Sequence, residues 1–404
     1  MVEGVDSSGQ SGRNRRRLDG AAGSYVPSRQ SRGLADGHDD EPEGTRITRQ
    51  RSRGTTTAKV ERSLDADDAT EARVSSAGDP YPALVIAMLY EHRFRAMNTD
   101  VGVWLWSGGA EHAPIVRSSF SWAQGFFGRV EQELSRFRST SALTRLNQRA
   151  GCGPQAVPPL LWTVLQSAFE AANDSKGIYD PTLCRTIERL GYDRSFECVE
   201  RTGAEHEDSP TPAFCAWQRV QLNGADRSVS LPRDLALDLG GIAKGWTVDQ
   251  VALALAPIGP VLVDAGGDLR VVGAVNGEAW PVAVQDPFEP EQNRALVRLR
   301  RGALATSSRG GRCWQRGSRT LHHVIDPRTG TSADSDLHTV TVYAPDTMSA
   351  DVAAKVVLVL GSEAGTVYLA KRDLSALLTN ADSRETIVGD FPCEVESHGS
   401  SRCA

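Results

Sequence analysis

The chain has little of what marks a membrane protein or a nucleic-acid-binding protein. Its longest apolar stretches, such as Val352–Leu360, are short and interrupted by charge at Lys355, so we expect no membrane span. Its formal net charge is −6 at pH 7, and a dedicated nucleic-acid binder usually carries a basic surface instead. The arginine-containing start of the chain lacks the apolar segment of a secretory signal, and no lipid-anchoring signature is seen.

Cysteine and N-terminal aromatic residues are also scarce. The seven cysteines form no CxxC pair and no metal-like cluster, so we expect mostly reduced thiols, which favours a cytoplasmic protein. The only aromatic residue before Tyr81 is Tyr25, and residues 1–80 are rich in charged and small polar side chains. Such a segment buries too little apolar surface to offset its ordering entropy. We therefore predict a disordered extension (1–80), a folded domain (81–393) and a flexible tail (394–404).

Strand-like and helix-like segments alternate in the folded part, which predicts an α+β fold. Residues 201–214 have the composition of an exposed loop, and Gly361 is placed to end a helix. The predicted strands are Asp100–Trp106, Leu235–Leu239, Pro260–Asp264, Leu269–Val275, Trp280–Gln285, Ala295–Arg300, His322–Ile325 and Thr339–Tyr343. The predicted helices are Ser121–Arg136, Pro159–Ser175, Ile242–Ala256 and Ala350–Leu360, followed by a shorter one after Ser362.

The string Asp238–Gly245 (DLGGIAKG) joins a predicted strand to a predicted helix. Its glycines allow a ligand to approach the backbone, and a helix N-terminus offers free N–H groups to an anion. Lys244 lies in the first helical turn, where the helix dipole disfavours a positive charge, so a bound phosphate or carbonyl explains it better than stability does. The spacing is not that of a Walker A motif. On these residues alone, a phosphate site and a plain tight turn have even odds.

Two further turns are ambiguous by themselves. The string Val263–Asp268 (VDAGGD) links two predicted strands, and in isolation it is best explained as a hairpin with glycines at positive φ. The string Gly177–Thr182 follows a helix, and its Tyr179 either stacks on a flat ring or packs in the core.

The string His322–Gly330 (HHVIDPRTG) is a strand that ends in an Asp-Pro turn. The turn is expected to bring His323 close to Asp326, Arg328 and Thr329. A histidine near its ordinary pKa can remove a hydroxyl proton at neutral pH. Without further context, a capped turn with one packed and one exposed histidine is slightly favoured.

The string Ser349–Lys355 (SADVAAK) opens a predicted helix. Ser349 can cap its N-terminus, and Asp351 in the first turn suits the helix dipole. That is a sufficient structural explanation. Asp351 is also a candidate Mg²⁺ ligand, because Mg²⁺ often binds one or two carboxylates together with substrate phosphates.

In their order along the chain, these strings resemble the FAD:protein FMN transferase family, known as ApbE. DLGGIAKG, DAGGD and HVIDPRTG together are highly specific, and the resemblance covers about Arg95 to Gly361. The matching pieces are Ala96–Thr99, Leu134–Phe137 with Ser141 and Leu146-Asn147, Gly177–Thr182, Asp238–Gly245 with Asp249, Asp264–Asp268, Ala305–Ser307, His323–Gly330 and Ala350-Asp351.

The resemblance implies a two-lobed, ApbE-like (T-fold-like) fold that binds FAD in a cleft. It places Mg²⁺ at the backbone oxygen of Gly241 and the carboxylate of Asp351. The implied catalytic residues are Asp351, through the metal, and His323, which would act as the base that deprotonates the acceptor hydroxyl. The residues at flavin-contacting positions are Met97, Phe137, Ile178, Tyr179, Asp180, Asp238, Lys244 and Ile325.

Four positions depart from the family pattern. Some members have an acidic residue and a threonine, which help to hold the metal, where this chain has Ala354 and Lys355. Lys355 lies one helical turn after Asp351, so the two can pair on one face. Its ammonium either replaces part of the charge of the metal or weakens metal binding. Asn98 stands in place of the usual glycine, and Phe137 in place of a frequent tyrosine.

The implied reaction moves the FMN half of FAD onto a threonine or serine hydroxyl of an acceptor protein and releases AMP. The acceptor would carry an Asp-x-x-Ser/Thr motif. One alternative is a metal-dependent FAD pyrophosphatase, with water in place of the hydroxyl. Another is a flavin-binding maturation protein without catalysis, which the lysine at position 355 keeps open.

Overall fold

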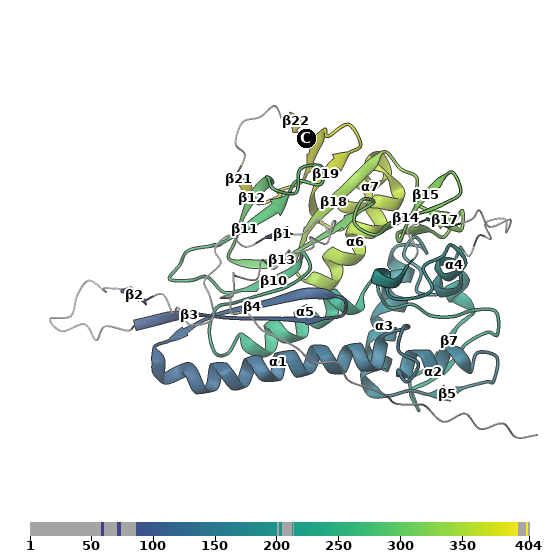
Figure 1. Ribbon diagram of the computed structural model, residues 1–404, viewed down its shortest axis with the longest axis horizontal. Helices are drawn as coiled ribbons and strands as arrows, with labels where there is room; N and C mark the ends of the chain where they lie inside the picture. Colours follow the sequence, from purple (N-terminus) through teal and green to yellow (C-terminus); the bar gives the residue numbers. More distant parts are fainter. Residues whose placement is uncertain are drawn as a thin grey trace, which may run out of the picture. The chain divides into compact units, whose positions relative to one another are not determined.

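The computed structural model describes residues 58–59, 71–73, 86–199, 202–203, 212, 214–394 and 401–402. The predictions for residues 1–80, 201–214 and 394–404 therefore fall largely outside the described residues. Within those ranges the chain is a mixture of helices and sheets (Figure 1), which confirms the predicted α+β class.

The largest sheet has the strand order β2-β3-β4-β9-β10-β13-β18-β19-β20-β22. Its neighbouring strands are antiparallel except for β20 and β22. The strands are β2 (Glu71–Arg73), β3 (Ile86–Ala96), β4 (Thr99–Gly108), β9 (Val261–Ala265), β10 (Asp268–Val272), β13 (Arg301–Ser308), β18 (Leu337–Ala344), β19 (Ser375–Asn380), β20 (Glu385–Val388) and β22 (Ser401–Arg402).

The central strands of this sheet pack apolar side chains on both faces, since successive side chains of a strand point to opposite sides. In β4, Val103 and Leu105 pack into one hydrophobic cluster, whereas Trp104 between them packs into another. The first cluster includes apolar residues of α1 (Ala113–Leu134) and α5 (Ala243–Leu255). The second includes residues of β11 (Trp280–Gln285) and β12 (Asn293–Leu299), which belong to a small sheet, β1-β11-β12-β21, with β1 (Ala58–Lys59) and β21 (Cys393–Glu394).

Helix α6 (Thr347–Leu360) connects the large sheet to a helical lobe. Its Ala353 and Val357 pack with β13, β18 and β19, while Val352 and Val356 pack into the core of the helical lobe. Figure 1 shows α6 between the sheet and the helices drawn in teal. In the described part of the chain, the helical lobe consists of four helices and one small sheet. The helices are α2 (Ala142–Gln148), α3 (Pro159–Asp174), α4 (Cys184–Arg189) and the 3-10 helix η3 (Ala216–Arg219). The sheet contains β5 (Gln155–Ala156), β7 (Gln221–Asn223) and β8 (Ser228–Ser230).

A third group of short elements lies where Ile187 and Tyr192 pack against Trp314 and Leu321. The remaining elements are η1 (Ala110–His112), η2 (Phe196–Cys198), β6 (Thr202–Gly203), β14 (Cys313–Arg316), β15 (Arg319–His322), β16 (Ile325–Asp326), β17 (Thr331–Ser332) and α7 (Ser362–Ala370).

The cysteines at 152, 184, 198, 215, 313 and 393 are free thiols, in agreement with their irregular spacing. None of the helices in the described ranges is both long and apolar enough to cross a membrane.

Three local predictions are wrong. Leu235–Leu239 is not a strand, because only Ala236 forms an isolated bridge, to Leu183. His322–Ile325 is interrupted, since β15 ends at His322 and β16 begins at Ile325. The N-cap of α6 is Asp346 and not Ser349, because the Asp346 carboxylate accepts the Ser349 N–H at 2.8 Å.

Candidate functional site

A cavity of about 750 Å³ opens among the tip of the β3–β4 hairpin, the loop after α1, the start of α5 and one face of α6. This volume is in the range of small-molecule sites. Every site residue predicted from the sequence lines it: Met97, Phe137, Ile178, Tyr179, Asp180, Asp238, Gly241, Lys244, His323, Ile325, Asp351 and Lys355.

The hairpin tip enters the cavity through a strained two-residue turn. Met97 and Asn98 have φ of 51° and 58°, a region that asparagine tolerates but methionine rarely adopts. The N–H of Met97 donates to the Glu131 carboxylate at 2.9 Å, which holds the tip on α1. Strain of this kind persists only where the surroundings enforce it, and it often marks a functional site.

Asp238 organises the loop that leads into α5. Its Oδ1 accepts the N–H of Gly240 at 2.7 Å, and its Oδ2 lies 3.0 Å from Nε of Arg136. The N-cap residue of α5, Ile242, makes no side-chain capping bond. Because Gly240, Gly241 and Lys244 line the cavity, the N-terminal end of α5 faces it. A helix N-terminus in this position favours an anionic ligand.

Lys244 is ion-paired with Asp268, and its Nζ also donates to the Ala265 carbonyl at 3.1 Å. Ala265 and Asp268 flank the turn between β9 and β10, whose Gly266 and Gly267 have φ of 64° and 91°. The predicted hairpin with glycines at positive φ is therefore confirmed. The same turn presents the buried Asp268 carboxylate to the cavity.

Asp351 and Lys355 form an ion pair on α6, as their spacing predicts. Asp351 is 1% exposed; its Oδ1 meets the ammonium, while its Oδ2 has no hydrogen-bond partner. Burial and the charge of Asp268 raise the pKa of Asp351 to about 6 against the opposing effect of Lys355. The stem of Lys355 runs past Gly241, where an added Cβ would be 3.4 Å from it.

His323 lies in the interruption between β15 and β16. Its N–H donates to the Arg312 carbonyl at 3.3 Å, and its Nδ1 has no partner. Burial and the positive charge of Arg312 hold the pKa of His323 well below its usual value, so the imidazole is neutral at pH 7. His322 is buried instead, with Nε2 2.9 Å from the Ala333 carbonyl. One histidine is thus packed and the other faces the cavity.

The other polar residues of the Asp-Pro turn do not join His323 in the cavity. Asp326 accepts bonds from the N–H of Arg328 and from its guanidinium, both at 2.9 Å, and its carbonyl accepts the N–H of Thr329 at 3.2 Å. Among the residues that line the cavity, Ile325 is the last from this turn. The expected cluster of four side chains is therefore a capped turn plus one separate histidine.

Tyr179 and Asp180 are buried polar residues in the wall of the cavity. Tyr179 packs against Gly241 and is 7% exposed, and its hydroxyl makes no hydrogen bond. Oδ1 of Asp180 accepts from the N–H and hydroxyl of Thr182, at 2.8 and 2.6 Å, and the backbone N–H groups of Ala216 and Trp217 also act on its carboxylate. An unpaired buried polar group is costly, so the Tyr179 hydroxyl is expected to meet a ligand or water.

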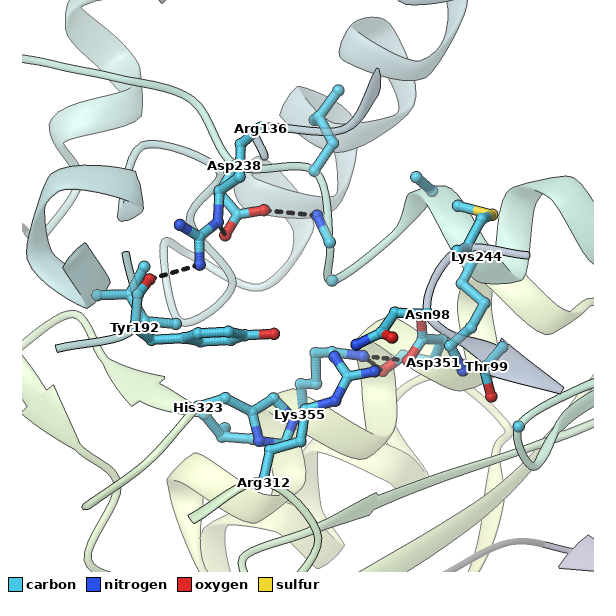
Figure 2. Close-up of a pocket in the computed structure, with 18 of the residues that line it drawn as sticks. Asn98, Thr99, Arg136, Tyr192, Asp238, Lys244, Arg312, His323, Asp351 and Lys355 are labelled. Carbon is cyan, nitrogen blue, oxygen red and sulfur yellow. Dashed lines mark hydrogen bonds and ion pairs between the residues drawn. The ribbon is translucent and has the colours of Figure 1, made fainter. Parts of the chain in front are cut away.

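Arg136, Tyr192 and Arg312 are cavity residues that sequence reasoning did not select. The Arg136 guanidinium lies 4.1 Å from the ring centre of Phe137 and 4.8 Å from that of Tyr192. Burial raises the pKa of the Tyr192 hydroxyl, and the positive charge of the nearby Arg312 acts against this. Figure 2 shows Tyr192, His323, Lys355 and Asp351 around one space. The Leu134–Phe137 string contained Arg136, but nothing local marked Tyr192 or Arg312.

The arrangement offers a flat aromatic surface, an anion site and a neutral imidazole in one cavity. Phe137 is 41% exposed, and Ile178 and Ile325 add apolar surface for a ring system. The N-terminal end of α5 and the two lysines suit phosphate groups. His323 is available to accept a proton beside them. These features fit an ester or anhydride of phosphate that carries an aromatic group.

Comparison with known proteins agrees with this description. The model of the ApbE family matches residues 97–378. A protein of Treponema pallidum described as FAD:protein FMN transferase is 32% identical over 261 residues, which cover 59% of this chain and 70% of that protein. A Vibrio cholerae protein of the same description is 27% identical over 253 residues, covering 62% and 75%.

Solved structures show the same fold. The ApbE protein of Thermotoga maritima superposes with a TM-score of 0.66 at 23% identity, covering 76% of this chain and all of that chain. The flavin transferase ApbE of Vibrio cholerae gives a TM-score of 0.62 at 23% identity, covering 75% and 98%.

Proposed function

Since this chain belongs to the ApbE family, we propose that it is an FAD:protein FMN transferase. It moves the FMN half of FAD onto a threonine or serine hydroxyl of an acceptor protein. Its relatives in Treponema pallidum and Vibrio cholerae bear this description. The observation that carries the proposal is that His323, whose Nδ1 has no hydrogen-bond partner, lines one cavity with the start of α5 and with both ion-paired lysines.

The reaction is a displacement at phosphorus. The acceptor oxygen forms a bond to the FMN-side phosphorus of FAD, the bond from that phosphorus to the bridging oxygen breaks, and AMP leaves with the electron pair. The hydroxyl proton passes to His323, which is neutral at pH 7 because burial and the charge of Arg312 lower its pKa. The phosphates rest at the N-terminal end of α5, where the helix dipole stabilises the growing negative charge.

FAD is held by groups on opposite sides of the cavity. Phe137, Ile178 and Ile325 provide apolar surface for the flavin ring, and Met97 lies at the hairpin tip beside them. The hydroxyl of Tyr179 donates a hydrogen bond to the ligand, which satisfies its otherwise unpaired buried atom. Asp180 and Asp238 bind nucleotide groups or hold the loops that do so.

Mg²⁺ is the cation that the sequence predicts at Gly241 and Asp351. Asp351 already pairs with Lys355. At an effective dielectric of 20, two unit charges about 4 Å apart interact by about 4 kcal/mol, so the attraction of a cation to Asp351 is largely cancelled by its repulsion from Lys355. The side chains present do not fit a resident Mg²⁺ ion, and the mechanism uses none.

The proposal is tested by incubating the full chain with FAD and a peptide that carries an Asp-x-x-Ser/Thr motif followed by small residues. We expect a covalent FMN adduct on the peptide by mass spectrometry, with AMP released in equal amount. Release of AMP without peptide, at the same rate, would identify an FAD pyrophosphatase instead. Bound but intact FAD in every reaction would identify a non-catalytic flavin-binding protein.

A further inference from the structure

Two lysine–carboxylate pairs meet in the wall of the cavity. Lys244 pairs with Asp268, and Lys355 pairs with Asp351. The side chain of each carboxylate is 2% exposed and that of each lysine is 20% exposed, so the acids are enclosed and the ammonium groups lie nearer the open space. The charge of Asp268 also acts on Asp351. The four residues therefore form one electrically neutral cluster.

The Lys355 side chain is held in place both along its aliphatic stem and at its ammonium group. Its stem runs past Gly241, and its Nζ donates to Oδ1 of Asp351 and to the Asp351 carbonyl, the latter at 3.4 Å. A lysine ammonium carries three N–H donors. Two are used within α6, which leaves one for a ligand in the cavity that Lys355 lines. The position that the family resemblance gives to a metal ion thus has its own cation.

We infer that the ammonium of Lys355 donates its remaining N–H to a pyrophosphate oxygen of FAD, at the position that the resemblance gives to a metal ion, so that transfer proceeds without a bound divalent metal ion. The inference rests on the proposed transferase function. Lys355 keeps its protons throughout: it donates a hydrogen bond to a phosphate oxygen while the bond to the departing AMP breaks. No oxidation or reduction takes place. Asp351 holds the ammonium in place and is a positioning residue in this scheme.

The first experiment measures transfer by the full chain with FAD and acceptor peptide after treatment with EDTA, with and without added Mg²⁺. We expect the wild-type rate to be the same in both conditions. Lys355→Thr, which removes the ammonium and adds an oxygen ligand, is expected to be about 100-fold slower than wild type in EDTA, since loss of one stabilising donor costs about 10²–10³ in rate. Added Mg²⁺ should restore at least part of this loss.

The second experiment measures cation binding without catalysis. Mn²⁺ binding, followed by electron paramagnetic resonance, should be undetectable in the wild type and appear at one equivalent in Lys355→Thr. The matched control is Lys371→Thr, at an exposed lysine that does not line the cavity, which should resemble the wild type in both experiments.

The outcomes separate the two proposals. Wild-type transfer that is lost in EDTA and restored by Mg²⁺ overturns this inference and leaves the proposed function intact. Stoichiometric Mn²⁺ binding by the wild type also overturns it, and this arm needs no folded variant. If no transfer occurs in any condition, the proposed function fails together with the inference.

Discussion

Arg136 and Asp238, 102 residues apart in the chain, form an ion pair with 3.0 Å between Nε and Oδ2. The Arg136 side chain is 3% exposed and also donates to the Tyr192 carbonyl at 2.8 Å. One buried guanidinium therefore joins the loop after α1 to the loop before α5 and to the segment of Tyr192. All three segments line the cavity (Figure 2).

This relationship predicts the effect of Arg136→Lys. Lysine cannot reproduce the planar stacking on Phe137 and Tyr192, nor the simultaneous bonds to Asp238 and the Tyr192 carbonyl. A hydrogen bond to a charged group is worth about 1.5–3 kcal/mol, so we expect FAD affinity to fall by about 10- to 100-fold in a fluorescence titration, with a smaller effect on kcat. Arg219→Lys is the control, because its pair with Asp234 is exposed and neither residue lines the cavity. Equal losses in both variants would contradict the prediction.

His323→Gln should abolish most transfer while FAD still binds. Removal of a general base typically costs about 10²–10⁴ in rate, and the glutamine amide cannot accept the proton. Because the pKa of His323 is held well below its usual value, the wild-type rate should stay level from pH 8 down past about 6.5, where an unperturbed histidine would be half-protonated. The measurement is kcat against pH, with FAD binding followed in parallel. A normal kcat in the variant would remove His323 from the mechanism.

The burial of His322 leads us to expect that the free energy of unfolding falls in mild acid. Its burial lowers its pKa to about 4, with Arg309 and His338 acting in the same direction and the Ala333 carbonyl and Asp334 opposing them. Below the unfolded value of about 6.5, the unfolded chain binds a proton that the folded chain does not, so the free energy of unfolding falls as pH drops from about 6.5 to about 4. The slope per histidine is about 1.4 kcal/mol per pH unit at most.

Urea unfolding at pH 7 and pH 5 measures this effect. His323 and other groups also titrate, so the informative quantity is the difference between the wild type and His322→Gln. We expect a smaller loss on acidification in the variant. Identical losses in the two proteins would mean that His322 is not the group responsible.

Lys244→Met should destabilise the protein because it leaves the Asp268 carboxylate buried without its partner. Removing one member of a buried pair costs about 3–5 kcal/mol, and the side chain of Asp268 is 2% exposed. Adding Asp268→Asn should recover part of that loss, since the amide oxygen can still accept the N–H of Thr306. Chemical unfolding of both single variants and the double variant measures the coupling. Additive losses would show that the pair contributes no interaction energy.

Much of the secondary structure was predictable because its signal is local. Helix α3 begins at Pro159 as expected and ends one residue early, and β11 has the predicted bounds. In α1 the buried positions Val116, Phe120 and Ala123 keep a helical period, but the polar Ser118 and Ser119 between them concealed its start. Strand β3 was missed since its exposed face carries charged residues, Arg93 and Arg95 among them.

The wrong predictions fall where tertiary contacts override local preference. Leu235–Leu239 is mostly apolar like a buried strand, yet the N–H of Asp238 bonds to the Pro181 carbonyl, so the segment is held as a loop at the cavity. The strand at His322–Ile325 is interrupted at His323, whose N–H bonds to the Arg312 carbonyl. Each of these departures from the predicted strand positions a residue that lines the cavity, Asp238 in the first segment and His323 in the second.

By itself, the sequence determined the α+β class, the order of the glycine-rich and histidine-containing strings, and the pairing of Asp351 with Lys355, because these depend on composition or on neighbours within one helical turn. Only the tertiary structure decided that Lys244 pairs with Asp268 and Arg136 with Asp238, and that Arg312 stands beside His323. Such contacts join segments distant in the chain. Their partners depend on strand order and helix packing, which no local pattern specifies.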